Sequence, residues 1–351
     1  MRRTIAIFAA CAAAIASFGR QVQNIAPEKA AEKNAPAGAM TCRDLACRMP
    51  AQVEGLLAVD IVRAASKESK VAQLTQRWSV NPFTVYFSEA KDDVFRRLTI
   101  EVRDNPVLLF AIAGAKFTVP YDIGVGRFDR MLVVRFERSV KAAVEKARAG
   151  NIEGLVLVAG DGPPIWKGSS AMQMGEYNRQ EHPQAPVVDE YVAFPDEHTI
   201  VISRSLEMAA GLVARWDKPG THIPRQWSIA AEGIDLGAPL IVLRRFDPTD
   251  TRDCFSPFRP GYLTRETAQI GQIAATVPSE KERTLTVRAS THDADHAEAW
   301  LRSAVKGIGD AVGPSVKRSD GIVEITTTAE EKRVGEFFLL LRAFSGPNFA
   351  I

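Results

Sequence analysis

Cysteine and histidine are scarce in this sequence, which has four cysteines and five histidines in 351 residues. They are too scattered for the paired Cys/His sets that hold structural zinc. The sequence also has no large excess of positive over negative charge, or the reverse. The formal net charge is +2, whereas a dedicated nucleic-acid-binding domain carries a strongly basic face. Past the N-terminus, no apolar run approaches the roughly 20 residues that a membrane-spanning helix needs. We therefore expect no nucleic-acid partner and no transmembrane span in the mature chain.

Motifs for catalysis or cofactor binding are missing as well. The glycines of 124–126 and 160–162 complete neither a dinucleotide nor a phosphate-loop pattern, and Pro163 removes a backbone donor from the second segment. Ser169 and Ser170 follow a glycine, but no nucleophile-elbow pattern surrounds them. The sequence assigns no catalytic residue and no cofactor, which favours a non-enzymatic protein.

The N-terminus has the layout of a secretory signal peptide over residues 1–19. Arg2 and Arg3 precede an alanine-rich apolar stretch over residues 4–16, and small residues follow at the spacing that signal peptidases accept. The stretch is short for a membrane span, and an uncleaved anchor is the alternative. We therefore expect an exported protein that is periplasmic or extracellular.

Residues 20–50 are predicted to be a disordered linker. Alanine, proline and charged residues dominate the part up to Ala39. Such a composition buries too little apolar surface to offset the entropy that ordering costs. The remaining 300 or so residues are long enough for a large core or for two domains.

The cysteines of the mature chain are Cys42, Cys47 and Cys254, since Cys11 lies in the leader. Export implies an oxidising compartment, in which disulfides persist. Because Cys42 and Cys47 are close in sequence, we predict a local disulfide between them. Pairing of Cys254 with one of the two, or three free thiols, are the alternatives.

Hydrophobic periodicity predicts an α+β fold, mainly antiparallel sheets with packed helices. The expected strands are 55–62, 98–103, 107–113, 131–136, 155–158, 191–194, 199–202, 229–233, 240–243, 284–288 and 322–327. Five helices are expected. One begins near Ser66, one covers 139–149, one begins at Ser205, one contains Ala297 to Ile308, and the last lies near the C-terminus.

Two α+β modules are expected from this order, over residues 51–217 and 218–351, each with a strand-helix-strand-helix pattern. Residue identity between them is negligible, and one continuous sheet with scattered helices is the alternative. The last helix has the clearest signals. Thr328 and Glu331 form a capping box before an apolar stripe that contains Phe337 and Phe338.

The weak candidates for metal ligands are His292 and His296. On a helix, this spacing of four residues places both imidazoles on one face. Asp293 stands where the zinc-protease motif has glutamate, and histidines at a polar helix start are usually solvated. Three aspartates, Asp247, Asp250 and Asp253, suggest a calcium loop but lack its alternating spacing and central glycine.

These observations favour an exported, non-enzymatic binding or structural protein of the cell envelope or exterior. A hydrolase with loop-borne catalytic residues, or a carrier of a small ligand or metal, are the alternatives. Its partner is a protein or a small molecule whose identity the sequence leaves open.

Overall fold

The computed structural model describes residues 40–64, 105, 107–114, 130–150, 152, 154–159, 163–171, 187–246, 269–277, 284–305 and 313–328. All of them belong to the unit Met40–Ile351, which separates from Met1–Ala39. Within the described part of the chain, no helix is both long enough and apolar enough to cross a membrane.

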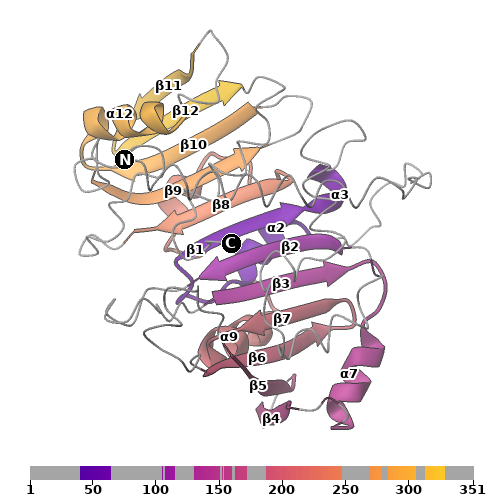
Figure 1. Cartoon of the computed structure of the whole chain (residues 1–351). Coiled ribbons are helices and arrows are strands. Elements are labelled where there is room, and N and C mark those ends of the chain that lie inside the picture. Colours follow the sequence, from indigo (N-terminus) through magenta and orange to yellow (C-terminus); the bar gives the residue numbers. More distant parts are fainter. Residues whose placement is uncertain are drawn as a thin grey trace, which may run out of the picture. The chain divides into compact units, whose positions relative to one another are not determined.

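The described strands join into a single antiparallel sheet (Figure 1). They are β1 (Gly55–Asp60), β2 (Val107–Gly114), β3 (Arg130–Phe136), β4 (Val156–Ala159), β5 (Ile165–Ala171), β6 (Val187–Asp196), β7 (Thr199–Ser203), β8 (Leu240–Arg245), β9 (Ile270–Val277), β10 (Thr284–Thr291), β11 (Ser315–Ser319) and β12 (Ile322–Thr328). Their order is β11-β12-β10-β9-β8-β1-β2-β3-β7-β6-β5-β4. Neighbouring strands are antiparallel at every pairing.

The described helices are short and lie on both faces of this sheet. They are α2 (Cys42–Arg48), α3 (Ile61–Ala64), α7 (Lys141–Arg148), α9 (Leu206–Ala214), α10 (Ser228–Ala231) and α12 (Ala294–Val305). Helices α7 and α12 contribute to one hydrophobic cluster, whereas α2, α9 and α10 contribute to the other.

The predicted α+β fold of antiparallel sheets with packed helices is wrong, because the described strands form one antiparallel sheet of twelve strands and the described helices are few and short. Strands β1 and β8, which the sequence places in different modules, pair directly, with Leu57 opposite Val242. Every residue of β1 is buried, so the strand lies inside one sheet rather than at the boundary of a module. The structure shows the alternative, one continuous sheet with scattered helices. Without the pairing of β1 with β8, each of these strands would be the edge of its own sheet, and the two edges join instead.

The two halves of this sheet nevertheless repeat one strand order. The first half runs β1-β2-β3-β7-β6 and the second runs β8-β9-β10-β12-β11. Helix α7 follows β3, and α12 follows β10. Strands β4 and β5 have no counterpart among the described strands of the second half. They lie between α7 and β6 in the sequence and extend the sheet beyond β6.

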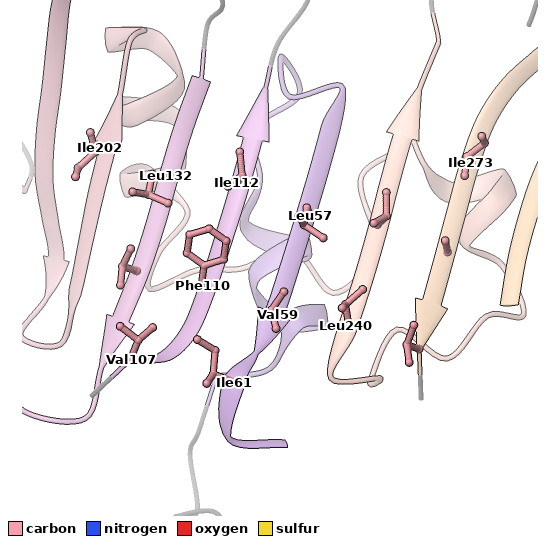
Figure 2. Close-up of a cluster of buried hydrophobic side chains, with 14 of the residues drawn as sticks. Leu57, Val59, Ile61, Val107, Phe110, Ile112, Leu132, Ile202, Leu240 and Ile273 are labelled. Atoms are coloured by element: carbon pink, nitrogen blue, oxygen red, sulfur yellow. The ribbon is translucent and has the colours of Figure 1, made fainter. Parts of the chain in front are cut away.

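Alternation along the strands divides the core between the two faces. On β1, Leu57 and Val59 point to one face, while Leu56 and Ala58 point to the other. Figure 2 shows the first face, on which Leu57 and Val59 lie beside Phe110 of β2. This two-sided burial is the reason that the central strands are almost continuously apolar.

The described part of the chain begins at residue 40, inside the stretch expected to be a linker. Thr41 Oγ1 accepts a hydrogen bond from Asp44 N, and Asp44 Oδ2 accepts one from Thr41 N, which forms a capping box for α2. Leu45 is fully buried. Arg48 Nε donates to Trp216 O at 2.9 Å, which fastens α2 to the end of α9.

One other local prediction differs from the structure, and one lies mostly outside the described residues. Residues 229–233 were expected as a strand, but α10 occupies 228–231, and Trp227 before it donates from Nε1 to Glu54 O at 2.9 Å. Thr328 is the last residue of β12, where it pairs with Thr284. The rest of the predicted C-terminal helix, including Phe337 and Phe338, lies outside the described residues.

Candidate functional site at the sheet edge

An apolar edge strand is the most unusual surface feature among the described residues. Strand β4 ends the sheet and pairs with β5. Val156 is 65% exposed, Leu157 57% and Val158 40%. Single exposed apolar residues are common on protein surfaces, but three in succession are not. Here they belong to the last strand in the order of the described sheet, which has a neighbouring strand on one side alone.

The exposed side chains of β4 lie on both faces of the sheet. Leu157 stands opposite Trp166, which is buried in the cluster that α7 joins, so Leu157 points to that face. Val156 stands opposite Lys167 and therefore points to the other face. The pairing with β5 shifts register between Leu157 and Ala159, so Val158 lies at an irregularity of the strand. A chain that adds to this edge would meet apolar side chains above and below its backbone.

Local signals place β4 at this edge. Helix α7 ends at Gly150, which has a φ of 69°, a conformation that glycine adopts without strain. Ile152 is 7% exposed and returns the chain to the core. Gly154, with a φ of 82°, makes the second turn into β4. The sequence predicts this strand, but its position at an edge depends on pairing with β5, which the sequence did not reveal.

Strand β5, the neighbour of β4, contacts β6 through side chains on both faces of the sheet. Trp166 is 3% exposed and packs edge-on against Phe194 of β6, with ring centroids 5.6 Å apart. On the other face, Lys167 Nζ lies 2.8 Å from Asp189 Oδ2. The hydrogen bond to Asp189 raises the pKa of Lys167, so this amine stays a cation.

The opposite edge of the sheet is different in charge. Strand β11 carries Lys317 and Arg318, one on each face, and four of its five residues are exposed. Arg318 Nη1 lies 2.7 Å from Asp295 Oδ1 of α12, and Arg318 Nη2 lies 2.5 Å from Glu298 Oε2. Charged residues on an edge strand oppose pairing with another sheet. Strand β4, with the sequence VLVA, has no such charge.

The histidine pair is not arranged as a metal site. Helix α12 begins at Ala294, so His292 lies in the preceding turn and does not share a helical face with His296. His296 Nδ1 lies 2.6 Å from Asp293 Oδ2, and Asp293 Oδ1 accepts from His296 N at 3.2 Å. Asp293 thus caps the helix, and its hydrogen bonds from His296 lower its pKa. Within the described ranges, no group of three or more potential metal ligands gathers.

Cys42 and Cys47 are free thiols in the structure, and both are buried. They lie on α2, where a separation of five residues corresponds to about 7.5 Å of rise along the axis. A disulfide needs Cα atoms about 4.4–6.8 Å apart, so an intact helix does not allow the predicted bond. Cys42 Sγ instead donates to Pro239 O at 3.4 Å. Burial raises the pKa of Cys42 to about 12, which leaves no thiolate for nucleophilic chemistry near neutral pH.

The other candidates from the sequence form no described catalytic group. Ser169 lies on β5 and donates from Oγ to Asp189 Oδ1 at 3.2 Å. Asp189 also holds Lys167, so this serine contacts an acid–base pair that is already neutralised. Several further residues lie outside the described ranges, namely Cys254, Asp247, Asp250, Asp253 and the glycines of 124–126 and 160–162.

Comparisons with known proteins give little further information. No family model matches the chain, and no curated protein matches it. A solved structure of TP0453, a Treponema protein, is similar over 89% of this chain and 98% of that one. The identity is 10% and the TM-score is 0.40. At this score the likeness supports no argument about fold, ligand or function.

Proposed function

We propose that the mature chain is an exported, non-enzymatic protein of the cell envelope or exterior that acts by binding another polypeptide. The leader, residues 1–19, supports export. The binding element in this proposal is the outer edge of β4. It would take an extended, uncharged segment of polypeptide as an additional strand, a recurring mode of recognition in which backbone hydrogen bonds give affinity.

The observation that carries this proposal is the exposure of three consecutive apolar residues on an uncharged edge strand. Natural sheets protect such edges with lysine, proline or a covering segment. This protein protects one edge in that way, at Lys317 and Arg318 of β11. Among the described residues the other edge is apolar and uncovered, which is consistent with pairing at that edge as its role.

A matched pair of positions tests the proposal. Leu157 on β4 and Ile229 on α10 have nearly equal exposure, 57% and 54%. A photo-crosslinking residue is placed at 157 or at 229 in the full-length chain, in the cells that produce it, and the envelope and medium are analysed after irradiation. We expect a specific covalent adduct from position 157, and none or much less from position 229.

Two outcomes would contradict the proposal. Equal adduct yields at 157 and 229 would mean that β4 is an ordinary exposed surface. Recovery of the chain inside the cell with its leader intact would remove the basis for export. Neither outcome depends on knowing the binding partner in advance, since the mass of the adduct identifies it.

A further inference from the structure

We draw no further inference here: the strongest candidate, the cluster of Arg288, Glu324 and Lys317 on the neighbouring strands β10, β12 and β11, is accounted for by its own ion pairs within the sheet, and nothing in the structure shows what would bind to it.

Discussion

Two aspartates on the sheet have opposite surroundings. Asp60, 8% exposed, ends β1, and its Oδ1 accepts a hydrogen bond from Arg63 N at 3.0 Å. Burial outweighs that bond and raises its pKa. Burial alone would also raise the pKa of Asp196, but hydrogen bonds from His198 N and from Arg135, at 2.6 Å, hold it below the ordinary range. The folded protein therefore disfavours the ionised form of Asp60 and favours the ionised form of Asp196.

The two asparagine variants should consequently shift stability in opposite directions. A raised folded pKa means that the folded state binds the proton more tightly, so Asp60 loses stability as pH rises above its ordinary range. Asp60→Asn should therefore be more stable than the wild type at pH 7. Asp196 contributes stability that is lost as pH falls through its lowered pKa. Asp196→Asn should cost about 1.5–3 kcal/mol at pH 7, as expected for bonds to charged groups.

Urea unfolding between pH 3 and pH 7 checks both directions. For each variant, the difference from the wild type should shrink toward the acidic end, where the carboxylates are protonated. Trp216 Nε1 also donates to Asp196 Oδ2 at 3.0 Å, so one of the five tryptophans that give the fluorescence signal contacts this site. Shifts of the same sign at pH 7 would contradict the contrast.

The thiol of Cys42 should be unreactive until the protein unfolds. It is fully buried, and its high pKa leaves it protonated. We expect peptide mapping after alkylation of the native protein to find Cys42 unmodified. Alkylation in guanidinium without reductant should modify both Cys42 and Cys47 completely. A linked peptide that contains both residues would instead support the disulfide that the sequence predicts, and would require α2 to open.

At the scale of elements, α2 should contribute strongly to stability. Leu45 on α2 is fully buried, whereas Leu206 on α9 is 37% exposed. Leu45→Ala should cost about 2–5 kcal/mol through lost apolar burial and a cavity, and Leu206→Ala should cost much less. Chemical denaturation measures both. Equal midpoints would mean that residues 42–48 behave as the linker that composition suggests.

Elements with a local signal were largely predictable. Ser205 was expected to cap a helix, and its Oγ accepts from Met208 N at 3.3 Å at the start of α9. The turn at 195–198 was expected between two strands and joins β6 to β7. Helix α2 was missed because the alanine- and proline-rich composition before it concealed the capping box of Thr41 and Asp44. Its stability comes from packing on the sheet, which no local pattern encodes.

At the scale of the whole molecule, the strand pairing could not be predicted. Strand β1 was found from its apolar run, yet nothing in that run specifies β8 as its neighbour. The candidate site could not be predicted for the same reason, because it depends on which strands pair. Residues 155–158 were predicted as a strand, but the exposure of Leu157 follows from its place at the end of the sheet. Non-local contacts decide both features, and residue patterns are local.

The proposed export implies a shortened mature chain. The small residues at 14–16 and at 17–19 offer cleavage sites for a signal peptidase. N-terminal sequencing of the exported protein should therefore begin between about residues 17 and 20. Intact Met1 on membrane-bound protein would mean that the leader is an uncleaved anchor.

The central position of β1 has a consequence for how the chain is made. This strand is complete at Asp60, but the strand that covers its second side, β8, begins only at Leu240. A chain emerging N-terminus first from a ribosome or an export channel therefore carries a strand that is apolar up to Asp60, with an open side, for about half of its synthesis. Closing such a distant pair is slow, and an unpaired strand invites association with other chains. The repeated strand order thus does not make either half self-sufficient, and nascent chains that stop short of β8 should need a chaperone to stay apart.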